Sequence, residues 1–244
     1  RSLVGLLPLC AVLVVEKSKL SARFLNMVSR LLKYRPDLAK NIPDLDISES
    51  SHLALLSIVN RNQMEHLLTE MLAENGFLSN YGVRSVSKYH EHQPYVLRVG
   101  ERDYRVDYSP GESTTEMFGG NSNWRGPVWF PVNYLLIQSL KKYSEFFGDD
   151  FKVECPTGSG RKLSLAEASG EISTRMVGLF QRNSENFRPA DLGLPPGLRN
   201  SQEWTKYPNF YEYFHGESGR GLGASHQTGW TSLVANLILA NNKK

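Results

Sequence analysis

The sequence predicts a mainly α-helical protein of 244 residues. Apolar side chains recur every three or four residues in several long segments, and this spacing places them on one face of a helix. Only one segment, residues 95–108, has the composition and central turn of a β-hairpin. Segments rich in glycine, asparagine or proline separate the periodic ones. This pattern favours helices packed around a common core, with long loops between them.

From Leu3 to Val15 the sequence is almost entirely apolar, and Pro8 interrupts the run. The run is shorter than the roughly 20 residues that a membrane-spanning helix needs. We expect a buried helix interrupted at Pro8, because proline removes a backbone donor from a helix interior. The chain starts at Arg1 and enters this run directly, so we interpret residues 1–244 as the C-terminal part of one larger domain.

Two amphipathic helices are expected next along the chain. Residues 20–34 place apolar side chains at helical spacing, and Pro36 ends this helix. Residues 62–74 show the same pattern, and Gly76 closes that helix. The apolar stretch between the two helices, residues 53–59, predicts a short turn or helix.

The remaining elements are predicted on the same grounds. Residues 95–108 predict a hairpin that decorates the helical body and is the only clear β element. Helices are expected at residues 133–147 and 164–180, again from apolar periodicity. Residues 183–208 are rich in proline, glycine and asparagine and predict a long surface connection. A last helix is expected to start near Thr228, whose hydroxyl suits an N-cap.

The composition argues against several classes of protein. The net charge of +3 is small and spread along the chain, so we expect no nucleic-acid partner. Cys10 and Cys155 are far apart and suit unpaired thiols better than a disulfide framework. The chain has no Asn-X-Ser/Thr sequon and no apolar run long enough for a membrane segment. We therefore expect a cytoplasmic location.

Residues 211–230 hold the strongest functional signal. Four glycines within residues 216–223 exclude a regular helix, so Glu212 and Glu217 are expected in a loop among aromatic side chains. Aromatic rings stack on the C–H faces of sugars, and a carboxylate can activate a water molecule. The stretch therefore favours sugar chemistry. The alternative is an ordinary solvated acid in a loop that precedes a helix.

A second informative stretch covers residues 119–129, where Trp124 and Trp129 flank Arg125. Trp124 could stack on a sugar, and Arg125 could donate hydrogen bonds to hydroxyls or to a carboxylate. The alternative is a tryptophan pair that packs a helix N-terminus, with Arg125 in an architectural ion pair. Trp129 lies within an apolar run and favours the core. His226 could bond the sugar or cap the last helix.

Other polar residues give weaker signals. Asp107, Glu112 and Glu116 surround the second stretch, and any of them could be a site acid, although a solvated loop charge is favoured for each. Residues 90–92 contain two histidines that resemble metal ligands, but no third ligand follows at a fitting spacing. Residues 157–162 lack the spacing of a phosphate-binding loop. We expect no metal and no cofactor.

Two motifs together resemble glycoside hydrolase family 63, which contains the processing α-glucosidase I (mannosyl-oligosaccharide glucosidase) and bacterial relatives. The first motif is NWRGPVWFPVNY at residues 123–134. The second is YEYF at residues 211–214, followed by the glycine loop and GWTSL at residues 229–233. The resemblance extends through essentially the whole chain. It implies the C-terminal portion of an (α/α)6 barrel, with a small β-hairpin insertion.

The resemblance also implies a reaction, namely inverting hydrolysis of α-glucosidic linkages in oligosaccharides or, in some members, of glycosyl glycerates. Glu212 matches the family's general base. The expected substrate-binding residues are Trp124, Arg125, Tyr213, Phe214, His226 and Trp230. No aspartate motif matches the family's general acid, which would lie upstream of Arg1, so we expect the isolated chain to be inactive. The alternatives are a non-catalytic glycan-binding module and a helical domain that binds a protein partner.

Overall fold

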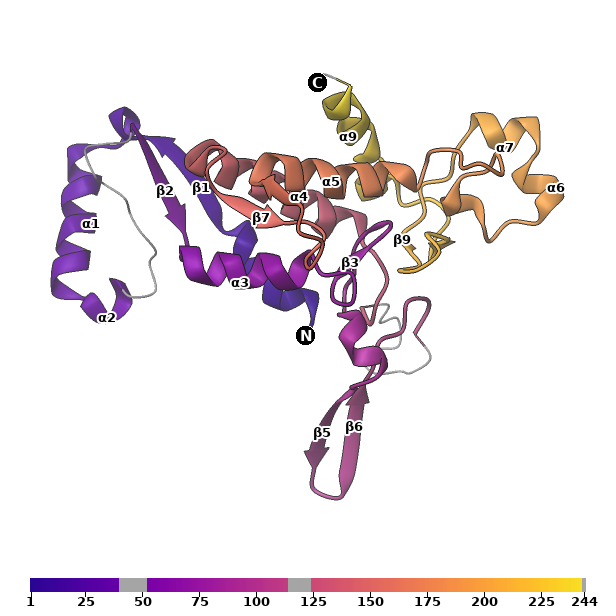
Figure 1. Cartoon of the computed structure of the whole chain (residues 1–244), viewed down its shortest axis with the longest axis horizontal. Coiled ribbons are helices and arrows are strands. Elements are labelled where there is room, and N and C mark those ends of the chain that lie inside the picture. Colours follow the sequence, from indigo (N-terminus) through magenta and orange to yellow (C-terminus); the bar gives the residue numbers. More distant parts are fainter. Residues whose placement is uncertain (40–51, 114–123, 243–244) are drawn as a thin grey trace.

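The computed structural model describes residues 1–39, 52–113 and 124–242 (Figure 1). Helices predominate in this part of the chain, and its strands form five separate two-stranded sheets, all antiparallel. The expectation of a mainly helical protein is confirmed. The helical body is compatible with part of a helical barrel.

The centre of the body is a pair of long helices, α4 (Phe130–Phe147) and α5 (Leu165–Gly178), which pack against each other (Figure 1). Both helices bury apolar side chains at helical spacing, as the sequence predicts. Those side chains are Leu136, Ile137 and Leu140 on α4, and Ala168, Ile172 and Met176 on α5. A capping box starts α5, because the Ser164 and Glu167 side chains each accept from the other's backbone N–H. The two helices form the platform that carries the later loops.

Four further elements complete the core. The helix α9 (Val234–Asn241) packs on α5, and the short α8 (Thr228–Thr231) contacts α4. Helix α3 (Arg61–Met71) packs against η1 (Leu3–Cys10), and η1 also contacts α4. A helix starts at the expected place, but it is the short α8, and the last helix, α9, starts only at Val234. Thr228 is not the N-cap of α8: Gln227 is, and makes no side-chain cap hydrogen bond.

The N-terminal region differs from its prediction. The helical part ends at Cys10 and is a 3-10 helix that contains Pro8. Residues Val12–Glu16 then form strand β1, which pairs along its length with β2 (Leu53–Ser57). The predictions of helix through Val15 and of a turn or helix at residues 53–59 were therefore wrong. Each strand is short, and β-branched valines favour a sheet once a partner is present.

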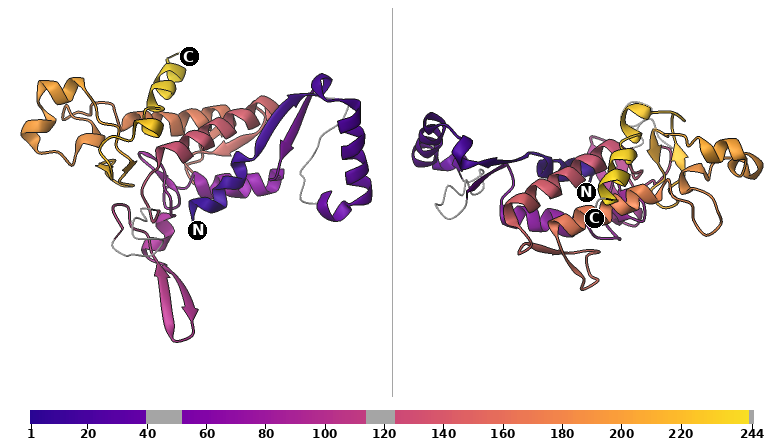
Figure 2. Two further views of the ribbon diagram at one scale, coloured as in Figure 1. Left: turned by 180° about the vertical axis from the view of Figure 1, so that it is seen from behind. Right: turned by 90° about the horizontal axis from the view of Figure 1, so that it is seen from above.

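The segment between β1 and β2 leaves the body. It contains η2 (Lys17–Lys19), then α1 (Ala22–Tyr34), which begins where the Ser21 hydroxyl accepts from the Phe24 N–H at 3.2 Å, and then α2 (Pro36–Ala39). Helix α1 and the later helices α6 (Pro196–Arg199) and α7 (Gln202–Lys206) lie at opposite ends of the molecule (Figure 1; seen from behind and from above in Figure 2).

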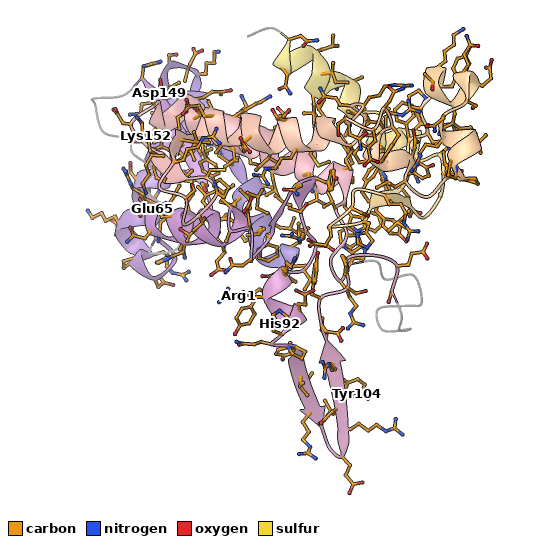
Figure 3. The ribbon with its side chains drawn as sticks, turned by 45° about the vertical axis from the view of Figure 1, so that its right-hand side comes forward. Arg1, Glu65, His92, Tyr104, Asp149 and Lys152 are labelled. Atoms are coloured by element: carbon orange, nitrogen blue, oxygen red, sulfur yellow. The ribbon has the colours of Figure 1, made fainter. Side chains whose placement is uncertain are left out.

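The expected hairpin is confirmed as β5 (Tyr95–Val99) and β6 (Arg102–Val106), which follow η3 (Lys88–Glu91). It projects from the body, and Tyr104 lies on the projecting part (Figure 3). The sequence had indicated that this hairpin is the only clear β element, and that prediction was wrong. Three other hairpins have strands of two or three residues, which are too short to produce an alternating pattern. They are β3 (Leu78–Ser79) with β4 (Gly82–Val83), β7 (Lys152–Glu154) with β8 (Lys162–Ser164), and β9 (Tyr213–Phe214) with β10 (Gly221–Leu222).

Residues 157–161 lie in the turn between β7 and β8, and Lys162 begins β8. The Glu154 carboxylate accepts a hydrogen bond from the Gly160 N–H. Bonds from the Gly158 and Gly160 backbones lower the pKa of Glu154. The backbone donors that resembled a phosphate-binding loop are thus occupied by the chain's own carboxylate.

Residues 183–208 form more than a surface connection. They contain η4 (Pro189–Asp191), α6 (Pro196–Arg199) and α7 (Gln202–Lys206). Arg188 and Asp191 are both buried there and form an ion pair at 2.6 Å. Element η4 contacts β10, so this segment packs beside the glycine-rich stretch.

Candidate active site

The two sequence motifs meet through backbone hydrogen bonds. Val128 and Phe214 exchange two of them: the Val128 N–H donates to the Phe214 carbonyl at 2.8 Å, and the Phe214 N–H donates to the Val128 carbonyl at 2.9 Å. Val128 also bridges to Arg84 on its other side. This short ladder places the Trp-Arg-Gly turn beside the stretch that contains Glu212.

The glycine-rich stretch is a hairpin rather than an open loop. Strands β9 and β10 pair Tyr213 with Leu222 and Phe214 with Gly221. The ladder continues past Tyr213, because the Glu212 N–H donates to the Ala224 carbonyl at 2.9 Å. Glu212 therefore lies at the end of a hydrogen-bonded hairpin, where its backbone is held on both sides.

Contacts around Glu212 fix both its backbone and its carboxylate. Its Oε2 accepts from the Ala224 N–H at 2.9 Å, and its carbonyl accepts from the Trp230 indole N–H at 3.0 Å. Gly223 has a φ of +69° and packs so closely that an added Cβ would lie 2.5 Å from Oε2. Within the described residues, no lysine, arginine or histidine pairs with Glu212. The half-buried carboxylate is held in place without being neutralised.

A stack of three aromatic rings lies beside Glu212. Trp124 stacks on Trp129, with ring centroids 4.3 Å apart and planes 3° apart, and Trp129 stacks on Tyr213 at 4.8 Å. Trp230 meets Trp129 edge-on at 6.0 Å. Trp124 is 41% exposed, whereas Trp129 and Tyr213 are buried. Trp124 therefore ends the stack at the surface, while Trp129 is buried as expected, in a small aromatic cluster apart from the main core.

Tyr213 carries a phenol whose ionisation is suppressed. Burial raises its pKa to about 12, with further contributions from the charges of Glu112 and Glu212. The phenol is therefore protonated throughout the physiological pH range and is able to donate a hydrogen bond. An added Cβ at Gly223 would lie 2.5 Å from both Glu212 Oε2 and Tyr213 Cε1, so the Glu212 carboxylate lies beside this ring.

Arg125 is buried and forms an ion pair with the Asp107 carboxylate. Burial lowers its pKa, and the nearby charge of Arg105 lowers it further. The Arg125 carbonyl accepts from the Ser109 N–H at 2.7 Å, so both its side chain and its backbone join the segment near Asp107. This arrangement favours the architectural alternative for Arg125.

Glu217, the other acid of the glycine-rich hairpin, is occupied by structural contacts. Arg84 donates to it at 2.9 Å, Lys88 at 3.0 Å and the Tyr108 hydroxyl at 2.5 Å. Partial burial alone would raise the pKa of Glu217, but the Tyr108 hydrogen bond and the charges of Arg84 and Lys88 lower it overall. The two acids of this stretch therefore have different environments, and of the two only Glu212 has no cationic partner within the described residues.

Two other predicted binding residues lie away from the stack. Phe214 is 0% exposed and packs edge-on against Phe180 in the main core, which favours a structural role. His226 is exposed, and its Nδ1 accepts from the Phe210 N–H at 3.3 Å, so it neither caps the last helix nor contacts the stack. Sequence reasoning missed Ala224 and the close approach of Gly223. The only sequence signal for this contact was that Gly223 lies in the same glycine-rich stretch as Glu212.

The described residues contain no group of three or more histidine, cysteine, aspartate or glutamate side chains that could hold a metal ion. The histidine pair at residues 90–92 is split: His90 is buried, with Nδ1 at 2.8 Å from the Gln93 carbonyl, while His92 is exposed. In the same part of the chain, no helix combines the length and apolar character that crossing a bilayer requires.

The helical scaffold thus sets a fixed carboxylate beside a pair of stacked tryptophans. Residues 48–231 match the family model described as "Mannosylglycerate hydrolase MGH1-like glycoside hydrolase domain". This match covers most of the chain, so the chain belongs to that glycoside hydrolase family. The expected relationship to the family 63 type is confirmed.

Three fungal proteins are similar to the chain. It is 44% identical over 242 residues, 98% of its length, to the Saccharomyces cerevisiae protein called "Uncharacterized protein YMR196W". It is 27% identical over 126 residues to the mannosyl-oligosaccharide glucosidase of the same yeast, and 28% identical over 123 residues to the probable mannosyl-oligosaccharide glucosidase of Schizosaccharomyces pombe. The latter two matches each cover 50% of this chain, and 12% and 11% of those proteins. The chain spans 22% of the length of YMR196W.

Proposed function

We propose that the protein containing this chain is a glycosidase that hydrolyses α-glucosidic linkages in oligosaccharides with inversion, and that Glu212 is its general base. One observation carries this proposal: the Glu212 carboxylate is fixed by Ala224 and Gly223 and has no cationic partner in the described residues, beside a tryptophan stack that ends at the surface.

Inversion requires two carboxyl groups on opposite faces of the sugar, roughly 6.5–9.5 Å apart, with room for one water molecule. In our proposal Glu212 is the ionised member of the pair. It removes a proton from the water as the water oxygen attacks the anomeric carbon. A protonated acid on the other face donates its proton to the leaving oxygen. The hydrogen bond from Ala224 aims the carboxylate before the substrate arrives.

We propose that the helical body is the C-terminal portion of an (α/α)6 barrel in a longer protein. The longer relatives support this proposal, because the chain covers only a fraction of each of them. The general acid would then come from another part of the same polypeptide. The isolated chain is accordingly proposed to be inactive, since one carboxylate performs only half of the reaction.

The sugar-binding surface in this proposal is built from the aromatic residues. The outer face of Trp124 is accessible for stacking on a sugar ring, and the Tyr213 phenol is a donor for a ligand oxygen. Trp230 acts through Glu212, whose carbonyl accepts its indole hydrogen bond. We assign structural roles to Arg125, Phe214 and His226, because their interaction partners are other residues of the chain.

The test uses the full-length protein and its Glu212→Gln variant. Both are assayed against a panel of α-glucosides and glycosyl glycerates, and NMR follows the anomer released first. We expect the variant to lose about 100- to 10,000-fold in kcat, the range for a lost general base, while sugar binding is retained. Glu203→Gln is the matched control, because Glu203 is an exposed acid on α7.

Each outcome has a separate meaning. Release of a β-configured sugar from an α-glycoside supports inversion, and an α-configured product refutes it. Full activity of Glu212→Gln refutes the assignment of the base. If the wild-type protein binds sugars but hydrolyses none, the site belongs to a non-catalytic glycan-binding module.

A further inference from the structure

A short segment that includes Glu112 is fastened to the glycine-rich hairpin. The Pro110 carbonyl accepts from the Gly216 N–H at 2.8 Å. Gly111 lies against the imidazole ring of His215, where an added Cβ would approach Cδ2 to 3.1 Å. These contacts hold the backbone next to Glu112 against the hairpin that also carries Glu212.

The acids around this hairpin differ in their partners. Asp107 is paired with Arg125, and Glu217 is paired with Arg84 and Lys88. Glu112 is exposed and, within the described residues, forms no ion pair or hydrogen bond. Of the acids around this hairpin, Glu112 and Glu212 are thus the two whose charges are not neutralised by any cation among the described residues.

Glu112 follows Gly111, whose backbone lies against His215, two residues after Tyr213 in the same hairpin. The charges of Glu112 and Glu212 both act on the phenol of Tyr213, which is the inner ring of that stack. An ionised carboxylate only accepts hydrogen bonds, and its two oxygens together accept from neighbouring hydroxyls. A sugar is rich in such donors, whereas an anionic group is repelled.

We propose that Glu112 is a second sugar-binding residue of the Glu212 site and that it selects neutral oligosaccharides over glycosyl glycerates. This inference rests on the proposed glycosidase function. Glu112 accepts hydrogen bonds from sugar hydroxyls, and its charge disfavours a ligand that carries its own carboxylate. Arg125, the buried cation of the neighbouring turn, is occupied by Asp107, with which Arg105 also forms an ion pair at 3.5 Å. Residues 114–123, which follow Glu112, contain one further acid and no lysine or arginine.

The experiment compares Glu112→Gln and Glu112→Ala with the wild type in the full-length protein. Kinetics are measured on a neutral α-glucoside and on a glycosyl glycerate. For the neutral substrate we expect KM to rise about tenfold to a hundredfold in both variants, the effect of losing hydrogen bonds to a charged group. We expect kcat to change less than threefold and the melting temperature to stay unchanged. Preference for the glycerate over the neutral substrate should increase about tenfold in Glu112→Gln, which keeps the shape and removes the charge.

The matched control is Glu101→Gln, at the exposed turn of the β5–β6 hairpin, which should behave as the wild type does. Unchanged KM and unchanged preference in both Glu112 variants would overturn the inference while leaving the proposed glycosidase function intact. If the wild type hydrolyses no substrate, binding of the same two ligands is measured by tryptophan fluorescence, and retained affinity in Glu112→Gln overturns the inference. If the wild type neither hydrolyses nor binds them, the inference is overturned together with the proposed function.

Discussion

Replacing Gly223 by alanine tests how Glu212 is held. Gly223 has a φ of +69°, and a Cβ at this position would lie 2.5 Å from Glu212 Oε2 and 2.5 Å from Tyr213 Cε1. Ordinary contact begins at 3.4 Å, so the carboxylate would have to retreat by 3.4 − 2.5 = 0.9 Å if it alone moved. A displacement of about 1 Å in a catalytic group can cost about 100-fold in rate.

The assay is kcat on the best α-glucoside of the panel, together with the free energy of unfolding from urea titration, both in the full-length protein. The matched control is Gly100→Ala, in the turn of the β5–β6 hairpin. Gly100 has a nearly equal φ of +63°, and nothing lies within 4 Å of an added Cβ there. Both substitutions carry the same backbone strain, about 1–2 kcal/mol for a left-handed non-glycine residue.

We expect Gly223→Ala to lose about 100-fold in kcat and Gly100→Ala to keep the wild-type rate. If the two variants turn over at rates within about threefold of each other, the contact between Gly223 and Glu212 does not position the reacting carboxylate. The reasoning about a pre-aimed base would then be refuted, even if Glu212→Gln is inactive.

Three further predictions concern neighbouring residues. Trp124→Ala should weaken sugar affinity about two- to tenfold in a fluorescence titration, because aromatic stacking contributes about 0.5–1.5 kcal/mol; unchanged affinity would argue against the sugar platform. Trp230→Phe removes the donor to the Glu212 carbonyl, worth about 1 kcal/mol, so we expect kcat to fall about fivefold with little change in KM. Glu217→Gln should lower the free energy of unfolding at pH 7 by about 1–2 kcal/mol, since it removes a partly exposed acceptor of Arg84 and Lys88. The folded pKa of Glu217 is lowered, so this stabilisation is present above the usual value of 4.5 and is lost as the pH falls through the folded pKa. Unfolding titrations below pH 4.5 should therefore show the difference between the wild type and this variant closing, and a difference that persists in strong acid would contradict the assignment.

The helices and the long hairpin were predictable because their signals are local. In α4 and α5 the apolar residues repeat over several turns, and the hairpin of β5 and β6 has a turn between two strands of five residues. The strands β1 and β2 were not predictable in this way. Each has five residues, and they pair across a segment that contains α1, so no local pattern identified the partner.

The candidate site was likewise predictable only in part. Glu212 and Trp124 were predicted from their residue types and from the motifs around them. The sequence also raised the binding and the architectural alternatives for Arg125, and only its burial beside Asp107 favoured the second. Our proposal replaces the sugar-binding roles expected for Arg125, Phe214 and His226 with supporting ones, and the inverting reaction and the cytoplasmic location stay predictions.

The sequence by itself determined which segments become the long helices and which residues are candidates for the chemistry, because side-chain periodicity and residue type act over a few neighbouring positions. Only the tertiary structure decided which of the two acids, Glu212 or Glu217, has no cationic partner in the part of the chain that the structure describes. Val128 and Phe214 bond across more than eighty residues, Arg84 reaches Glu217, and the backbone of Ala224 aims Glu212. These contacts form when distant segments pack together, and the resulting burial and electrostatic field distinguish two glutamates that lie five positions apart.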